Sequence, residues 1–152
     1  MKLNYIYIPA TGEVINQNTS PLHGECEMSL EEYLHKKIKI PNKKDFYFEF
    51  LRDITYLEKQ NRALHIHLPG KVPALLDRAI WEALPLFPKN HFCQPHESFI
   101  VNMHHIKKYK PGDPPHLEMN MNAIIPVTRG FKDQLVDSLN TFAIGFPPRN
   151  TK

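Results

Sequence analysis

The chain has 152 residues, of which 41% are hydrophobic and 23% are charged, and its formal net charge at pH 7 is +3. Length and composition fit one folded domain with a short extension, and they exclude a disordered chain. The sequence has no run of about 18 apolar residues that could cross a bilayer and no apolar segment of a secretory signal near its start. We therefore expect a cytoplasmic protein without a membrane partner.

Cysteine and lysine patterns add little to this picture. Cys26 and Cys93 are far apart and have no C-x-x-C spacing, so neither a zinc knuckle nor a disulfide framework is expected. The only tight basic cluster is Lys107, Lys108 and Lys110, which is typical of a solvated strand end. Charge alone does not indicate a nucleic-acid partner.

Residues 1–44 are predicted to form an N-terminal extension. Residues 5–8 alternate as a short strand. Ser29 and Glu32 have the spacing of a capping box, which predicts a short helix that begins at Ser29 and ends before Pro41. Residues 41–44 are predicted to be a linker, because proline disfavours continuing the helix and two lysines keep the segment solvated.

From residue 45 onward the pattern indicates a mainly β domain with short helices. Aromatic and β-branched residues predict strands at 46–51, 54–57, 63–68, 98–102, 106–109, 116–119 and 123–127. Apolar side chains at helical spacing predict amphipathic helices at 74–84 and 130–142. The domain is expected to span residues 45–145, followed by a frayed tail at 146–152.

Three motifs in this domain occur in a fixed order. They are Asp53-Ile-Thr-Tyr-Leu-Glu58, Phe92-Cys-Gln-Pro-His-Glu-Ser-Phe-Ile-Val-Asn102 and Ile125-Pro-Val-Thr-Arg129. With the predicted helices, this arrangement resembles the LytTR family of bacterial DNA-binding domains. The resemblance implies an elongated multi-sheet β fold whose loops enter successive major grooves of double-stranded DNA. It implies a non-enzymatic transcription regulator that needs no cofactor and that binds a specific site, as a homodimer on repeated half-sites.

Arg129, Arg62 and Glu97 are the candidates for contacts with bases. Arg129 follows a predicted strand end and can present its guanidinium to guanine O6 and N7, and the alternative is a surface arginine paired with Asp133. Arg62 lies in a loop at 60–62 that matches a DNA-binding loop of the family, and the alternative is a solvated loop tip. Glu97 departs from the family pattern, which usually carries Arg or Asn there; a carboxylate is repelled by phosphates but can accept a hydrogen bond from cytosine N4.

Four further side chains are candidates for contacts with phosphates. Ser98, Thr128 and Lys132 carry the hydroxyl or ammonium donors that suit phosphate oxygens, although each can also be an ordinary surface residue. His96 either lies beside the DNA or orients its loop through a hydrogen bond. Asn102 is expected to cap a turn through its side chain rather than to touch a base.

Two other classes of function stay open. The chain has nine histidines, and His65 and His67 lie two apart on a predicted strand, so they share one face. With His96 or residues 104–105 they could bind a metal in a β-rich metal-dependent enzyme, or they could be the solvent face of a strand. The third class is a LytTR-like protein-interaction module that has lost DNA binding, which Glu97 and the modest net charge allow.

Overall fold

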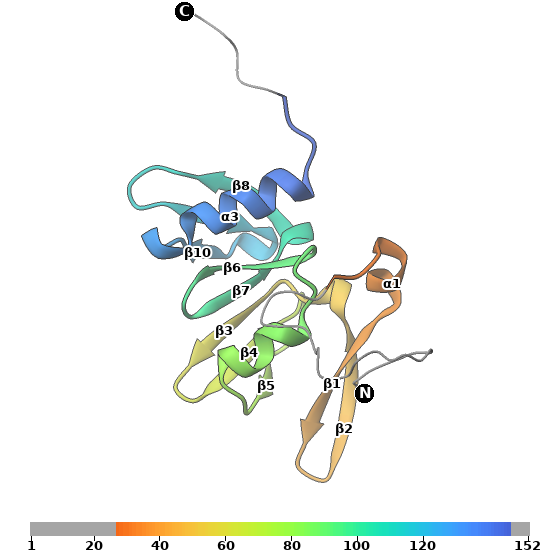
Figure 1. Ribbon diagram of the computed structural model, residues 1–152. Coiled ribbons are helices and arrows are strands. Elements are labelled where there is room, and N and C mark those ends of the chain that lie inside the picture. Colours follow the sequence, from red (N-terminus) through yellow and green to blue (C-terminus); the bar gives the residue numbers. More distant parts are fainter. Residues whose placement is uncertain (1–26, 147–152) are drawn as a thin grey trace, which may run out of the picture.

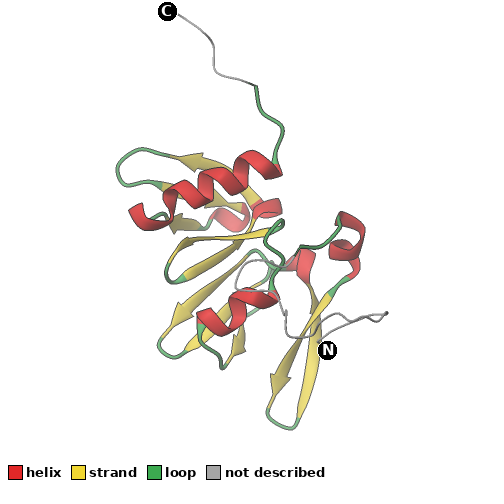
Figure 2. Cartoon of the chain, viewed as in Figure 1, coloured by secondary structure: helices red, strands yellow, loops and turns green. Residues whose placement is uncertain are grey.

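The computed structural model describes residues 27–146, which form three antiparallel sheets with short helices (Figures 1 and 2). The strands are β1 Lys37–Asn42, β2 Asp45–Phe50, β3 Tyr56–Gln60, β4 Ala63–His67, β5 Ala74–Leu76, β6 Phe92–His96, β7 Phe99–Asn102, β8 Ile106–Lys110, β9 His116–Met119 and β10 Ile124–Pro126. The helices are α1 Leu30–His35, α2 Ile80–Ala83 and α3 Arg129–Phe142. The prediction of a mainly β, multi-sheet fold is confirmed.

The sheets follow one another along the molecule. The two-stranded sheet pairs β1 with β2, the five-stranded sheet has the order β5-β4-β3-β7-β6, and the three-stranded sheet has the order β10-β9-β8. Figure 1 shows the five-stranded sheet between the other two, with α3 lying against the end that carries β8, β9 and β10.

Alternation of apolar and polar residues explains why these segments form the strands of the central, five-stranded sheet. Leu57 of β3 stands opposite Ile66 of β4 and Ile100 of β7, and all three side chains are fully buried. Their neighbours along each strand face the other side of the sheet, as a period of two requires. Burial of each such side chain contributes about 1.5–3 kcal/mol to folding.

Helix α3 closes a second core over the three-stranded sheet. Leu135 is fully buried and packs with Leu117, Met119 and Ile125, while Leu139 is half-buried against the same cluster. The four-residue spacing of Leu135 and Leu139 places both on one face of the helix. The predicted helix at 130–142 is thereby confirmed, with Arg129 as its first residue.

The segment before residue 45 differs from its prediction. Helix α1 ends at His35, and Ile38 and Ile40 then alternate with lysines in β1, with Ile40 fully buried. Residues 41–44 are no linker, because β1 pairs with β2 along its whole length and the chain turns at Lys43, whose φ is 52°. Because side chains alternate along a strand, β1 places both Ile38 and Ile40 against the first core.

Two further elements differ from the predictions. Residues 74–84 form β5 and the four-residue helix α2, because Ala74 and Leu76 alternate as buried positions on the edge of the central sheet beside β4. Residues 92–96 form β6, which was not predicted as a strand. Pro95 lacks the N–H of a ladder, but β6 is an edge strand, where proline is tolerated.

Some predictions fall outside the described residues: the strand at residues 5–8, Cys26 and the tail beyond residue 146. Within residues 27–146, no helix is both long and apolar enough to cross a membrane. Cys93 is a buried free thiol, and burial raises its pKa to about 12.

Asn102 joins the segments around the two cores. Its side-chain amide group is fully buried and donates to the Tyr33 hydroxyl (2.8 Å) and to the backbone carbonyls of Ile54 (2.9 Å) and Leu51 (3.3 Å). Its carbonyl oxygen accepts from the His104 N–H at 3.0 Å. This last bond confirms the prediction that Asn102 caps a turn.

Candidate nucleic-acid interface

Three connections carry the candidate residues, and Figure 1 shows them along one edge of the ribbon. The β3–β4 turn holds exposed Arg62 beside Asn61, whose φ of 57° lets the strands reverse within two residues. The β6–β7 turn consists of exposed Glu97 and half-buried Ser98. The third connection leads from β10 through Thr128 into α3.

Backbone hydrogen bonds tie the three connections to one another. The N–H of Lys59, at the end of β3, donates to the Ser98 carbonyl at 2.8 Å. The N–H of Thr128 donates to the Pro95 carbonyl of β6 at 3.1 Å. The β6–β7 turn therefore lies between the other two, and the structure brings together candidates that are 67 residues apart in sequence, from Arg62 to Arg129.

The β6–β7 turn is shaped by His96. Its ring nitrogen Nδ1 accepts a hydrogen bond from the Ser98 N–H at 3.0 Å, and its ring lies edge-on to Phe99 with the centroids 5.5 Å apart. His96 therefore orients its turn through this hydrogen bond, which is one of the two roles that the sequence left open. The other role is a contact with DNA. Glu97 is exposed at the tip, and within residues 27–146 no cation lies within ion-pair distance of its carboxylate.

The first turn of α3 is electrostatically unfavourable on its own. Arg129 and Lys132 are exposed there, the turn has no acidic residue, and the Thr128 side chain makes no cap hydrogen bond. Cations near a helix N-terminus oppose the helix dipole, whereas an anion there is stabilised by the dipole and by the free N–H groups. The expected alternative for Arg129, a pair with Asp133, is not among the ion pairs of residues 27–146. An anion bound at this turn would offset the charges of Arg129 and Lys132.

Comparison with known proteins identifies the family of the chain. The model of the LytTr DNA-binding domain matches residues 44–140, well over half of the chain. The chain belongs to the LytTR family. Among solved structures, the LytTr DNA-binding domain of a Bacillus cereus protein described as a methyl-accepting/DNA response regulator is 22% identical, with a TM-score of 0.61. The match covers 68% of this chain and 96% of that one and supports the fold. No curated protein matches the chain.

The histidines of the metal hypothesis do not converge in the LytTR domain. His67 stacks on Tyr56 with the ring centroids 4.2 Å apart, and its Nε2 lies 3.4 Å from Glu58 Oε1 without hydrogen-bond geometry. His105 Nε2 donates to the Arg52 carbonyl at 2.7 Å. Within the described range, no three potential ligands among His, Cys, Asp and Glu form a group that could hold a metal ion.

A histidine pair that the sequence did not reveal lies beside the LytTR domain's central sheet. His91 Nδ1 is 2.8 Å from His104 Nε2, and His91 Nε2 is 2.8 Å from the Met28 carbonyl. Both rings stack on Tyr33 with centroid distances of 4.4 Å. The residues are distant in sequence and belong to no motif, so only the folded chain shows this cluster.

The histidine pair predicts a loss of stability in mild acid. Burial, followed by the neighbouring His91 and His105, lowers the pKa of His104 to about 4. This folded-state pKa lies below the unfolded value of about 6.5, so the unfolded chain binds more protons between these two pH values. The contribution of neutral His104 to stability is therefore fully present above about pH 6.5 and is lost as the pH falls toward about 4. His104 is exposed on one side, where solvent screens the penalty, so we expect a loss of about 1 kcal/mol.

Urea unfolding at pH 7 and pH 5 measures this loss. His104→Gln keeps a donor toward His91 but does not titrate, so its free energy of unfolding should fall less between these pH values. Equal losses in the two proteins would show that His104 does not carry the effect.

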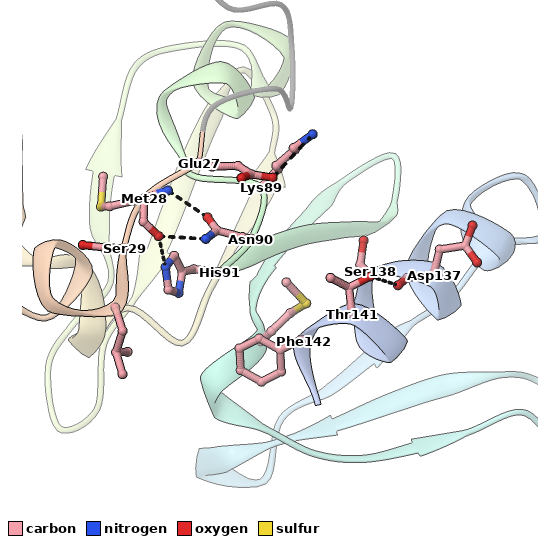
Figure 3. A pocket seen from close by; sticks show the side chains of 12 residues that line it. Glu27, Met28, Ser29, Lys89, Asn90, His91, Asp137, Ser138, Thr141 and Phe142 are labelled. Carbon is pink, nitrogen blue, oxygen red and sulfur yellow. Dashed lines mark hydrogen bonds and ion pairs between the residues drawn. The ribbon is translucent and has the colours of Figure 1, made fainter. Parts of the chain in front are cut away.

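A cavity of about 680 Å³ lies beside the same histidines (Figure 3). It opens between the residues before α1, the turn at 88–91 and the C-terminal half of α3. The Asn90 amide exchanges two hydrogen bonds with the Met28 backbone, at 2.7 and 3.0 Å, and His91 binds the same residue. These polar groups hold the segment before α1 in place. The cavity adjoins the C-terminal half of α3, whose lining residues Asp137 to Phe142 lie about 12–20 Å from Arg129 along the helix.

Proposed function

We propose that the protein is a transcription regulator that binds specific double-stranded DNA sites through the three connections at one edge of its LytTR domain. The observation that carries the proposal is the pair of backbone hydrogen bonds that joins these connections, from Lys59 to Ser98 and from Thr128 to Pro95. Through them Arg62, Glu97 and Arg129 share one edge. Side chains on such an edge can enter successive major grooves on one side of a duplex.

The base contacts come from the exposed tips. Arg129 and Arg62 can each donate two hydrogen bonds to guanine O6 and N7, which no other base pair offers in the same pattern. Glu97 can accept from cytosine N4, and its lack of an ion-pair partner within residues 27–146 leaves the carboxylate available. Each bidentate arginine contact discriminates against a wrong base by about 1–3 kcal/mol.

The phosphate contacts come from the residues around these tips. Lys132 supplies an exposed ammonium, and the Thr128 hydroxyl makes no cap hydrogen bond to the N–H groups of α3. Ser98 supplies a second hydroxyl. His96 uses Nδ1 to hold its turn, which leaves Nε2 for a phosphate. Such contacts fix the position of the protein on the duplex without reading its sequence.

Two copies on repeated half-sites complete the proposal. The three connections of one copy of the protein can contact only a few base pairs. A second copy bound to the same duplex increases both affinity and specificity. The site would then contain two similar half-sites with a fixed separation.

Selection from random duplexes, followed by a mobility-shift assay with and without a chelator, tests the proposal. Retention of a common sequence that is insensitive to the chelator is the expected result. Stoichiometric bound zinc together with chelator-sensitive activity would favour the metal-dependent enzyme. A folded protein that retains no duplex would favour the interaction module.

Glu97→Gln is expected to strengthen binding to random-sequence duplex. Removing the carboxylate removes repulsion from nearby phosphates, worth about 1 kcal/mol at low salt. The gain should shrink as the Debye length falls from about 30 Å at 0.01 M salt to about 8 Å at 0.15 M. Affinities across a salt series measure it.

Glu31→Gln is the matched control, because Glu31 is exposed on α1 and the substitution makes the same change in charge away from the edge. It should change affinity far less. An equal response of both variants, or no response of Glu97→Gln at any salt concentration, would remove the β6–β7 turn from the interface.

A further inference from the structure

The β1–β2 hairpin exposes an aromatic face that the proposed DNA-binding edge does not use. The register places Phe50, Phe48 and Phe46 of β2 directly opposite Lys37, Lys39 and Pro41 of β1. Because side chains alternate along a strand, these six residues share one face of the hairpin, which we call the aromatic face. Phe46 is 52% exposed and Phe48 is 51% exposed. Figure 1 shows the hairpin projecting from the body of the molecule.

The aromatic face is also basic. Lys39 Nζ lies 4.4 Å from the centre of the Phe46 ring, and Lys37 Nζ lies 4.8 Å from that of Phe50. Arg52, just beyond β2, places its guanidinium carbon 4.1 Å from the same Phe50 ring. These cations are free of ion pairs within residues 27–146.

Carboxylates are kept off this face. Asp45 and Glu49 are the acidic residues of the hairpin strands, and the alternation of β2 puts both on the opposite face. Glu49 is in addition bound to Lys71, with Nζ 3.0 Å from Oε1. The aromatic face therefore carries three cations and no compensating charge from its own strands, which favours an anionic partner and disfavours pairing with a second copy of itself.

We propose that the aromatic face binds single-stranded nucleic acid, with unpaired bases stacked on Phe46 and Phe48 and phosphates paired with Lys37, Lys39 and Arg52. Proteins that bind single strands combine cations along the backbone with aromatic rings on which bases stack, and sheet surfaces serve this purpose. Duplex DNA hides the faces of its bases, so it cannot use the rings. An acidic peptide would satisfy the cations but has no planar bases for the exposed rings.

The contacts in the free protein are compatible with a base replacing Lys39 on the Phe46 ring. A base that stacks on the Phe46 ring takes the position of the Lys39 ammonium. The displaced ammonium is then close to the phosphate of the same nucleotide. The β1–β2 hairpin lies apart from the β3–β4, β6–β7 and β10–α3 connections in Figure 1, so we expect binding there to be independent of the proposed reading of duplex DNA.

Fluorescence anisotropy of a labelled 15-nucleotide oligothymidine with the full chain tests the proposal. Phe46→Ala and Phe48→Ala should each weaken binding about tenfold, and Phe46→Trp should retain it. Tyr47→Ala is the matched control, because Tyr47 is an exposed aromatic residue on the same strand but on the opposite face. It should leave the affinity unchanged.

Two further variants keep the test decisive. Lys37→Gln with Lys39→Gln leaves the rings in place and should reduce the slope of log affinity against log salt by about 1.4 if two phosphates are lost. Arg129→Ala should weaken duplex binding without changing binding of oligothymidine, which separates this proposal from the one above.

The proposal is overturned if oligothymidine does not bind at 50 mM salt or if binding survives both phenylalanine substitutions. It is equally overturned if Arg129→Ala abolishes oligothymidine binding, since the strand would then use the duplex-binding edge. Binding of a glutamate-rich peptide or of anionic vesicles in place of the oligonucleotide, with the same dependence on Phe46, would assign the face to a different partner.

Discussion

Asn102→Ala is expected to lower the free energy of unfolding by about 3 kcal/mol or more, without any change at the DNA-binding edge. The substitution removes four hydrogen bonds and leaves the Tyr33 hydroxyl and the Ile54 carbonyl without this donor, whereas the Leu51 carbonyl still accepts from the Ile54 N–H. A buried polar group without a partner costs about 1–3 kcal/mol, and several such groups would be created at once. Urea unfolding followed by circular dichroism measures the change.

Asn140→Ala is the control for this substitution, because Asn140 is exposed on α3 and alanine favours a helix. It should change stability by less than about 0.5 kcal/mol. Asn102→Asp tests the role of the donor, since an ionised carboxylate cannot donate to the three oxygens. A loss below about 1 kcal/mol for Asn102→Ala would contradict the central place of this side chain in the fold.

Arg129→Ala should weaken binding to the selected duplex by about 1–3 kcal/mol and relax the preference at one base pair. The physical reason is the loss of the proposed bidentate contact between Arg129, the first residue of α3, and guanine. Affinities for the selected duplex and for all single-base variants of it measure both effects.

Lys132→Ala, one helical turn further along α3, is the matched comparison. Losing a phosphate contact should weaken all sequences alike and reduce the salt slope by about 0.9. The two substitutions therefore differ in kind, not only in size. If Arg129→Ala left affinity and base preference intact in a folded protein, Arg129 would not be a base reader.

The sequence predicted those elements in which local pattern and tertiary packing agree. Strands β4 and β9 alternate cleanly, and α3 carries apolar residues at helical spacing, so all three form where predicted. The errors arose where a short apolar run fits either period. Leu75 and Leu76 were predicted to lie on the apolar face of a helix, yet residues 74–76 pair with β4 at the edge of the central sheet, and no local pattern records that pairing.

The position of the candidate site could also be predicted only in part from the sequence. The family resemblance placed Arg62 and Glu97 in loops and Arg129 after a strand end, and each of the three is exposed in the structure. That the turns are joined could not be predicted, because the bond from Thr128 to Pro95 depends on how α3 docks against β6. The same holds for His91 and His104, which meet only because both pack on Tyr33.

The most direct test of the proposed DNA-binding edge is to map backbone amide NMR shifts when the selected duplex is added to the labelled protein. The account predicts that the largest changes fall at residues 60–63, 96–99 and 127–132 together, with little change in β1, β2 or the walls of the cavity at Asn90. Changes confined to any other surface, with these three connections unaffected, would contradict it.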